Sequence, residues 1–477
     1  MNEIKPVKKR PFFKKLAFAS ADILGGGSFN IINFLYPAFL ALTLGLSAYW
    51  CGIVLLLAKV WDGVIDPIIG YISDHTKSRW GKRRVYLIFV SPLLIISFFL
   101  LFFPFQIENT TLSIIVCLLT YILFSLVQSA IMIPYYSLSS EISKDYNERA
   151  SYNSYRLGFS IFSSIICVAI PGLIVNAFGG VNGGYQVMGL SFGILFALAT
   201  FITGFFSREE VITPPSKEKF SVRQLVKPLK IKSYRLYLLM YWMVQMAMAI
   251  MSGLFFFYID FYICKDLTST GSSNSVGLIG AALMFGMQIV ALPVYLKIIK
   301  TKGKTFAYRL GGLIWILSAL ALLLIPLIPT STQPLIVYLL AAIMGFGISG
   351  PGLVPHTMFG DIVDVGEVKL GERLDGQMGG FTNFVNQISQ ALGLFLMMTL
   401  LGVAGFVEQP LPQTPENTIR SQPEGVILAI QLIMALTPLV LMGIGMLVSY
   451  KYKIDAKKHL VVREALEAKD PSKIQDL

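Results

Sequence analysis

Residues 59 to 84 of this chain read K-V-W-D-G-V-I-D-P-I-I-G-Y-I-S-D-H-T-K-S-R-W-G-K-R-R. The stretch continues an uncharged run from Leu42 to Ala58, so Asp62 and Asp66 fall inside a hydrophobic segment. A charge near the centre of a bilayer costs about 2.5–3.5 kcal/mol on insertion scales, so such residues usually face a water-filled cavity. The stretch therefore predicts a membrane helix in which two carboxylates mark the path of an ion or a solute.

The spacing of the two acids indicates a cation site. Four residues apart, Asp62 and Asp66 share one helix face, with Cβ atoms about 5–6 Å apart. Two carboxylates that close repel each other, so one takes up a proton or a cation lies between them. Lys59, one turn before Asp62, is the expected charge partner. The alternative is structural: Lys59 forms a buried salt bridge with Asp62, and Asp66 begins the Asp-Pro turn of a bent helix.

The composition is that of a membrane protein. Of 477 residues, 55% are hydrophobic and 14% are charged, and the mean hydropathy is +0.67. The net charge of +12 is spread over short loops between apolar spans, which favours positive-inside topology over a nucleic-acid surface. The chain has no phosphate-binding G-x-x-x-x-G-K-[ST] loop, zinc pattern or G-x-S-x-G elbow. We therefore expect neither an enzyme nor a cofactor.

Hydrophobic segments long enough to cross a membrane recur twelve times. They are 17–43, 47–73, 85–105, 111–139, 153–177, 185–206, 236–263, 276–297, 308–328, 333–358, 378–406 and 425–450. The loops on one side hold nearly all Lys and Arg, whereas those on the other hold only Lys265 and Arg420. Both termini are therefore expected in the cytoplasm.

The longest basic linker divides the spans into two sets of six. We expect an N-terminal half over 1–206, a cytoplasmic linker over 207–235, a C-terminal half over 236–450 and a cytoplasmic tail over 451–477. Two six-helix halves with a solute site at mid-membrane are the plan of the major facilitator fold, an all-α membrane architecture.

Four blocks of sequence resemble the glycoside-pentoside-hexuronide:cation symporters. Beside the opening stretch they are P-Y-Y-S-L-S-S-E-I-S-K-D-Y-N-E-R-A-S-Y-N-S-Y-R at 134–156, G-D-I-V-D-V-G-E-V-K-L-G-E-R-L-D-G at 360–376 and F-V-N-Q-I-S-Q-A-L-G at 384–393. They follow the family's order. The resemblance implies symport of a sugar or glycoside with Na⁺, Li⁺ or H⁺.

The resemblance also implies roles for individual residues. Asp62 and Asp66 match the family's cation pair, and Ser129 matches a hydroxyl that supplies a further oxygen. Arg156 matches an arginine of the sugar site. Tyr136 stands where the family has an aromatic residue that contacts sugar, and an aromatic face suits the apolar side of a pyranose.

Departures from the family pattern leave the solute open. Met132 replaces a sugar-binding aspartate, and Gln387 replaces a lysine. Gly26 lies near the family's aspartate in the first span, and Asp22, one turn earlier, is the expected solute acceptor; a charge snorkelling toward the interface is the alternative. Gln387 still donates and accepts hydrogen bonds, so we also place it at the solute.

Charged sets at the inner ends of the helices resemble facilitator gates. In the first half, Asp74 precedes five basic residues that include Arg79. In the second half the set is Asp361, Asp364, Glu367 and Arg373. The alternatives are a positive-inside anchor and a solvated face, because most exposed ion pairs contribute little.

These observations predict a multi-pass plasma-membrane symporter that works as a monomer. Its partners are a sugar, glycoside or hexuronide, a coupling Na⁺ or H⁺ and the bilayer, with no nucleic acid. An anionic hexuronide or another non-sugar solute is the first alternative, and a membrane sensor without transport is the second.

Overall fold

The computed structural model describes residues 11–143, 146–179, 183–209, 227–263, 272–329, 331–371, 375–409 and 421–468. These residues are almost entirely helical, and no strand occurs among them. The expected all-α fold is therefore confirmed, whereas the number of twelve membrane helices is not. Ten helices of the described part are long and apolar enough to cross a membrane.

Two of the expected spans lie outside that set of ten. One is α3 (Ala48–His75), which contains Lys59, Asp62 and Asp66. The other is the 85–105 segment, which breaks near Val90 into α4 (Arg84–Phe89) and α5 (Ser91–Leu101). Neither piece of the broken segment reaches the length of a full span.

The chain divides into two compact units. The first holds Met1–Leu46, Val60–Lys219 and Gln409–Thr418, and the second holds Ser47–Lys59, Phe220–Glu408 and Ile419–Leu477. The division passes through α3, after Lys59.

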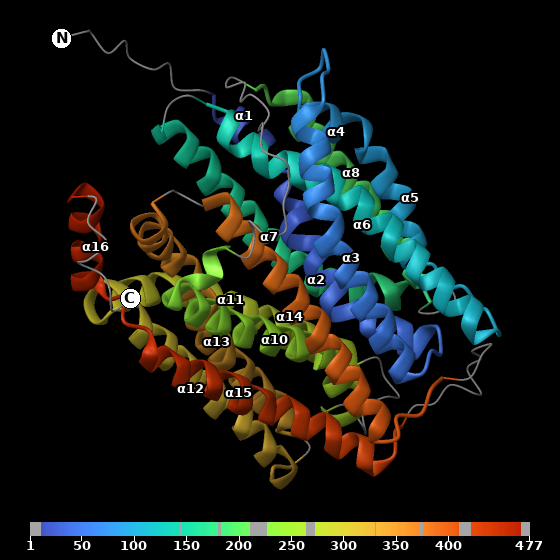
Figure 1. Cartoon of the computed structure of the whole chain (residues 1–477). Helices are drawn as coiled ribbons and strands as arrows, with labels where there is room; N and C mark the ends of the chain where they lie inside the picture. The colour runs from blue at the N-terminus through green and yellow to red at the C-terminus, as the bar shows by residue number, and fades with distance from the viewer. Residues whose placement is uncertain are drawn as a thin grey trace. The chain divides into compact units, whose positions relative to one another are not determined.

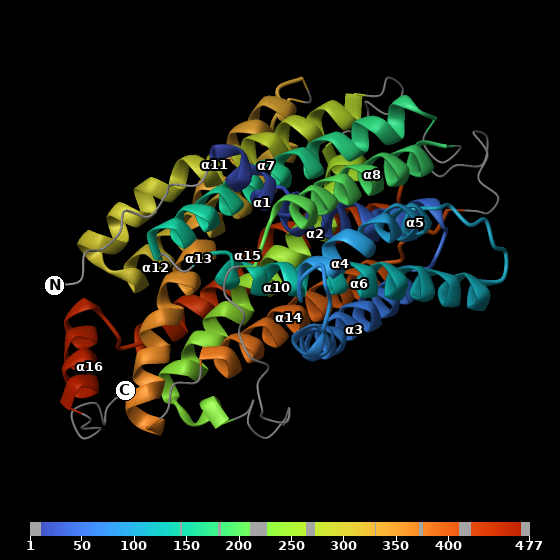
Figure 2. The ribbon, with the colours of Figure 1, turned by 90° about the horizontal axis from the view of Figure 1, so that it is seen from above.

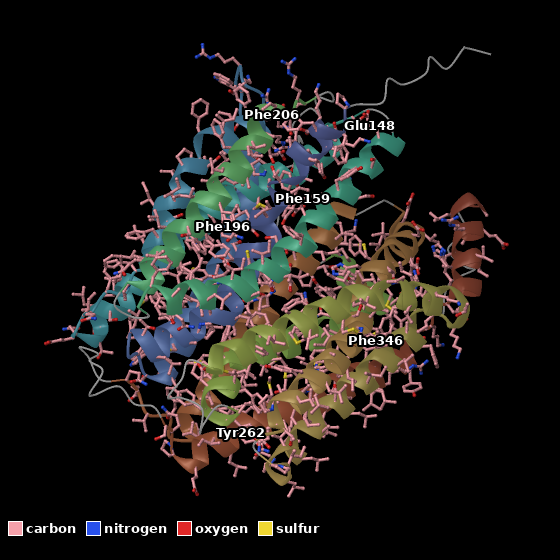
Figure 3. All side chains as sticks on the ribbon, turned by 180° about the vertical axis from the view of Figure 1, so that it is seen from behind. Glu148, Phe159, Phe196, Phe206, Tyr262 and Phe346 are labelled. Carbon is pink, nitrogen blue, oxygen red and sulfur yellow. The ribbon has the colours of Figure 1, made fainter. Side chains whose placement is uncertain are left out.

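The first unit is built from paired helices (Figure 1). Besides α4, α5 and the part of α3 after Lys59, its elements are α1 (Phe12–Ala19), α2 (Asp22–Ala38), η1 (Phe39–Thr43), α6 (Thr110–Glu141), α7 (Tyr146–Ala177) and α8 (Gly184–Phe206). α2 packs along α7, and α5 packs along α8. Phe196 of α8, labelled in Figure 3, is fully buried and meets the ring of Phe98 edge to face at 5.3 Å.

The second unit is built around α13 and α10. Its elements are η3 (Lys227–Lys230), α10 (Lys232–Tyr258), η4 (Ile259–Ile263), α11 (Ser272–Lys302), α12 (Lys304–Ala321), η5 (Leu322–Leu327), α13 (Gln333–Leu370), α14 (Asp375–Val403), α15 (Glu424–Lys451) and α16 (Ala456–Ala468). α13 packs against both α11 and α12, and α10 packs against α14 and α15 (Figure 2).

α13 extends beyond the expected span. That span was expected over 333–358, but the helix continues through residues 361–370, which form its last turns. Gly371, with φ of +74°, ends the helix, and its N–H donates to the Glu367 carbonyl over 2.9 Å. No proline or glycine pair interrupts the turns before it, so the helix continues until a residue suited to the left-handed conformation stops it.

Close approach of α11 and α13 depends on a glycine. A Cβ at Gly345 would lie 2.0 Å from the Met284 carbonyl oxygen. Small residues let membrane helices come this near. Gly345→Ala should therefore lower stability by about 1–3 kcal/mol through overpacking, read as a lower unfolding temperature of the purified protein. Gly352→Ala on the same helix is the matched control, because a Cβ there meets nothing within 4 Å; equal unfolding temperatures for the two variants would contradict this packing.

Candidate functional site

Two carboxylates of α3 face a row of hydroxyls on α6. Ser129 Oγ donates to Asp66 Oδ1 over 2.6 Å, and Tyr121 OH donates to Asp62 Oδ2 over 3.2 Å. Ser125 Oγ also donates to Asp62. Both carboxylates are half-buried. The arrangement gathers hard oxygen atoms, the ligand type that alkali cations and protons require.

The hydroxyl row follows from helix geometry. Residues 121, 125 and 129 are spaced by four, so they lie one above another on α6, as Asp62 and Asp66 do on α3. Ser129 was expected here from the family resemblance, whereas Tyr121 and Ser125 were not expected. The four-residue spacing was a signal that could have found them, once α6 was known to lie beside α3.

Lys59 lies on the same helix, one turn before Asp62. Lys59 is only 3% exposed, which is rare for a lysine. It is the last residue of α3 that belongs to the second unit. A buried lysine is normally paired. Its position on α3 is compatible with both the counter-charge and the salt-bridge interpretation.

The first unit also contains an ion pair between α2 and α7. Arg156 Nε lies 3.0 Å from Asp22 Oδ2, which also accepts a hydrogen bond of 3.4 Å from Tyr135 OH. The Arg156 guanidinium lies over the Tyr136 ring at 5.3 Å. The Asp22 side chain is 6% exposed, so its charge is buried and compensated within the protein. Three of the residues expected at the solute, Asp22, Tyr136 and Arg156, are therefore neighbours.

Position 25, beside Asp22, has no room for a side chain. A Cβ at Gly25 would lie 2.6 Å from the Met132 methyl, 2.8 Å from Asp22 Oδ1 and 3.2 Å from Tyr136 OH. The Met132 methyl, the Asp22 carboxylate and the Tyr136 hydroxyl therefore all lie close to Gly25.

Gln387 is placed on α14 in the second unit, among other amides. Gln245 Nε2 donates to Asn386 Oδ1 over 2.7 Å, and Gln390 Nε2 donates to the same oxygen over 2.9 Å. Gln387 Oε1 is buried and accepts no hydrogen bond from the described residues. An unsatisfied buried acceptor is costly, which makes this oxygen available to a donor from outside the protein.

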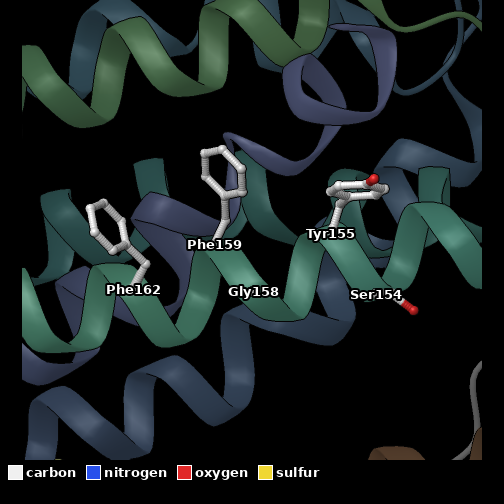
Figure 4. Close-up of a pocket in the computed structure, with 5 residues that line it drawn as sticks. All are labelled: Ser154, Tyr155, Gly158, Phe159 and Phe162. Atoms are coloured by element: carbon white, nitrogen blue, oxygen red, sulfur yellow. The ribbon is translucent and has the colours of Figure 1, made fainter. Parts of the chain in front are cut away.

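α7 also lines a pocket of about 410 Å³ (Figure 4). Its lining residues are Ser154, Tyr155, Gly158, Phe159 and Phe162. The rings of Tyr155, Phe159 and Phe162 point to one side of α7, and Ser154 points away from them. None of these lining residues is charged, so the pocket differs in chemistry from the site around Asp62 and Asp66.

The expected gate of the first unit centres on Arg83. Its guanidinium pairs with Asp74, donates from Nη1 to Ser73 Oγ over 2.8 Å, and lies with Nε 3.5 Å from Glu141 Oε2. Lys82 Nζ lies 3.6 Å from Asp74. Arg79, which we expected here, is exposed. Glu141, at the end of α6, was missed because nothing in the local sequence links it to the α3–α4 loop.

The expected gate of the second unit joins α13 to α12 and α16. Lys304 Nζ lies 2.5 Å from Asp361 Oδ2, and His459 Nε2 lies 3.1 Å from Asp364 Oδ2. Burial and the Asp361 carboxylate raise the pKa of the Tyr452 hydroxyl well above its usual range. Glu367 lies in the last turn of α13, and Arg373 lies outside the described residues.

The contact of His459 predicts how α16 is held. His459→Ala should release α16 from α13, since it removes the side chain that meets Asp364, and amides of α16 should then exchange hydrogen faster. Leu460→Ala is the matched control because Leu460 is 62% exposed. Exchange as slow in His459→Ala as in the control would show that apolar packing, of Val462 and Ala465 among others, holds the helix without His459.

Helices long and apolar enough to span a membrane, with an ion pair between two of them and half-buried acids that meet the hydroxyls of a third, are typical of a polytopic membrane transporter. Residues 17–456 match the family described as MFS/sugar transport protein, and the chain belongs to that family. The resemblance to the glycoside-pentoside-hexuronide:cation symporters of the major facilitator superfamily is thereby confirmed.

Relatives and solved structures agree with this family. An uncharacterized symporter of Synechocystis is 24% identical, with 98% of this chain and 99% of that protein covered. An isoprimeverose transporter of Lactiplantibacillus pentosus is 25% identical over 93% and 89%, and the chicken sodium-dependent lysophosphatidylcholine symporter 1 is 22% identical over 88% and 83%.

The structure of the nucleoside transporter NupG matches with a TM-score of 0.62 at 13% identity, covering 92% of this chain and 98% of that one. A bacterial homologue of the lysosomal transporter Spinster matches with a TM-score of 0.62 at 12% identity over 95% and 97%. At these identities the likeness concerns the fold.

Proposed function

We propose that this protein is a cation-coupled symporter that takes up a sugar or glycoside across the plasma membrane. The observation that carries the proposal is the pair of half-buried carboxylates, Asp62 and Asp66, each bonded to hydroxyls of α6. A site of this kind changes charge when a monovalent cation or proton binds. Names of relatives support the coupling and the solute class: one is a sodium-dependent symporter, and another is an isoprimeverose transporter.

The mechanism rests on charge neutralisation. An empty Asp62/Asp66 pair carries repelling charges that are costly to enclose in a low-dielectric protein. Binding of Na⁺ or H⁺ lowers that cost, so the occluded state becomes accessible after the cation has bound. Differential stabilisation of one conformation is what coupling requires.

The solute contacts proposed in the first half are Asp22, Tyr136 and Arg156. Arg156 is already compensated by Asp22 at 3.0 Å, so an incoming carboxylate would meet a pair with no net charge, one member of which repels it. Hydroxyl groups of a neutral sugar can bond to both members of the pair, and the Tyr136 face suits a sugar ring. This favours a neutral glycoside over a hexuronide, which is the second candidate because Arg156 is the cation of the set.

The proposal also includes the topology. Twelve spans, with α3 and the α4–α5 pair as the second and third, form two six-helix halves that alternate access to a midplane site. Both termini are placed in the cytoplasm from the distribution of Lys and Arg. In the second half we assign Gln387 to the solute. The working unit is the monomer.

The test is solute-induced pH change in de-energised cells that express this chain. Neutral glycosides, pentosides and hexuronides are added one at a time, with and without Na⁺. Alkalinisation by one solute class identifies that class and proton coupling. Accumulation that requires Na⁺ without a pH change assigns the site to sodium. Solute binding without flux would favour a sensor, and silence across the panel in well-expressed protein would exclude the sugar classes.

A further inference from the structure

Two charged side chains connect the end of α8 with the loop that precedes α4. Glu209, three residues after α8, accepts backbone N–H bonds from Lys82 over 2.9 Å, Arg83 over 2.6 Å and Arg84 over 3.2 Å. In the other direction, Arg84 donates from Nε to the Gly204 carbonyl over 2.8 Å and from Nη2 to the Phe205 carbonyl over 3.0 Å. Each segment thus satisfies backbone groups that the other leaves open.

The loop backbone is shaped to receive the Glu209 carboxylate. Gly81 has φ of +108°, a conformation that side-chain-bearing residues rarely adopt. A Cβ at Gly81 would lie 2.8 Å from Glu209 Oε1. Three successive N–H groups that converge on one carboxylate form a nest for negative charge, and here the protein itself supplies that charge.

The same loop carries Arg83, the central residue of the expected gate of the first unit. The Arg83 backbone N–H is held by Glu209, while its side chain reaches Asp74 of α3 and lies 3.5 Å from Glu141 of α6. Arg83 is 4% exposed, so its position is determined by these contacts. Release of the backbone would let the guanidinium move away from both acids.

We propose that Glu209 is a positioning residue of the cytoplasmic gate, which holds Arg83 between Asp74 and Glu141 by binding the loop amides. The gate role of Arg83 rests on the proposed function, in which access to the site alternates between the two sides of the membrane. Loss of Glu209 then loosens the inner ends of α3 and α6 and makes opening of the cytoplasmic side easier, while the acidic pair and the ion pair of Asp22 are left unchanged.

The test requires no solute, so it is independent of which solute is carried. Ile142, which directly follows α6 and is 1% exposed, is replaced by cysteine in a background whose four native cysteines are serine. Its reaction rate with a maleimide is measured in membranes for the parent, Glu209→Ala, Glu209→Gln, Arg83→Ala and the Arg83→Ala/Glu209→Ala double variant. Glu108→Ala is the matched control, because Glu108 is an exposed acid of the same unit.

Glu209→Ala should raise the labelling rate by about tenfold, which equals ~1.4 kcal/mol of opening free energy and is the scale of losing hydrogen bonds to a charged group. Glu209→Gln, which keeps one acceptor oxygen, should give a smaller increase. The double variant should label no faster than Arg83→Ala alone, since the two residues act through one contact set.

Three results would overturn the proposal: labelling of Glu209→Ala at the rate of Glu108→Ala, additive effects in the double variant, or Glu209→Gln as fast as Glu209→Ala. If Glu209→Ala does not fold, the Glu209→Gln comparison decides alone, with parent-like labelling as the contradicting outcome. A failure of solute uptake with these labelling results intact would count against the proposed solute and not against the role of Glu209.

Discussion

Asp66→Asn should abolish cation-dependent accumulation of solute and leave the protein folded. Asparagine keeps the size of aspartate and an oxygen that can accept from Ser129 Oγ, now 2.6 Å from Asp66, but it removes one of the two negative charges. Opposite unit charges about 4 Å apart attract by about 4 kcal/mol at an effective dielectric constant of 20, so cation affinity should fall by about three orders of magnitude.

The measurement compares uptake at rising Na⁺ concentration and at rising proton concentration. Ser129→Ala is the graded companion, because it removes one hydroxyl and keeps both charges; it should weaken cation dependence by about tenfold, the scale of one charge-assisted hydrogen bond. Thermal unfolding of the purified variants separates a lost site from a lost fold. Full accumulation by Asp66→Asn would refute the cation assignment.

Arg156→Gln should lower both transport and stability, and a second substitution should restore only stability. Without Arg156, the Asp22 carboxylate keeps the 3.4 Å bond from Tyr135 but loses its charge partner inside the protein. Removing one member of a fully buried ion pair costs about 3–5 kcal/mol, and because the Arg156 side chain is 28% exposed, the loss should lie near the lower end of that range. The Asp22→Asn/Arg156→Gln double variant has no buried charge at this place and should regain most of that stability.

The double variant separates a structural role from a role at the solute. If the pair serves the solute, uptake should remain at least about a hundredfold below the parent even where the unfolding temperature recovers, because groups built to bond a solute are lost. Leu157→Ala, at a 60% exposed neighbour of Arg156, is the control for disturbance of α7. Recovery of uptake together with stability would make the pair a structural element only.

Much of the fold follows from the sequence because a bilayer imposes a simple rule. A membrane helix must satisfy its own backbone and be apolar over a fixed length, so each segment can be recognised alone. α10, α14 and α15 begin and end within a few residues of the expected spans. The span expected over 333–358 stopped short because the charged residues that follow it do not suit hydrocarbon, whereas the helix runs on to Leu370.

The acidic pair was also evident from the sequence, since Asp62 and Asp66 belong to one helix and their spacing determines their common face. Ser129 was placed with them only by resemblance. Tyr121 and Ser125 could not be placed with Asp62, because their contact depends on which face of α6 packs against α3. That choice is made by the fit of side chains between helices, and not by the period of either helix.

The partners of the charged loops depended most on the tertiary structure. Glu141 and Glu209 meet Arg83 across separations of more than fifty residues, and His459 meets Asp364 from the far end of the chain. Loop charges have no period that could reveal such pairs. The sequence by itself determined most of the helices, the common face of Asp62 and Asp66, and the family. Packing between helices decided which charge meets which, because burial forces a charge to find a partner only after the helices have come together.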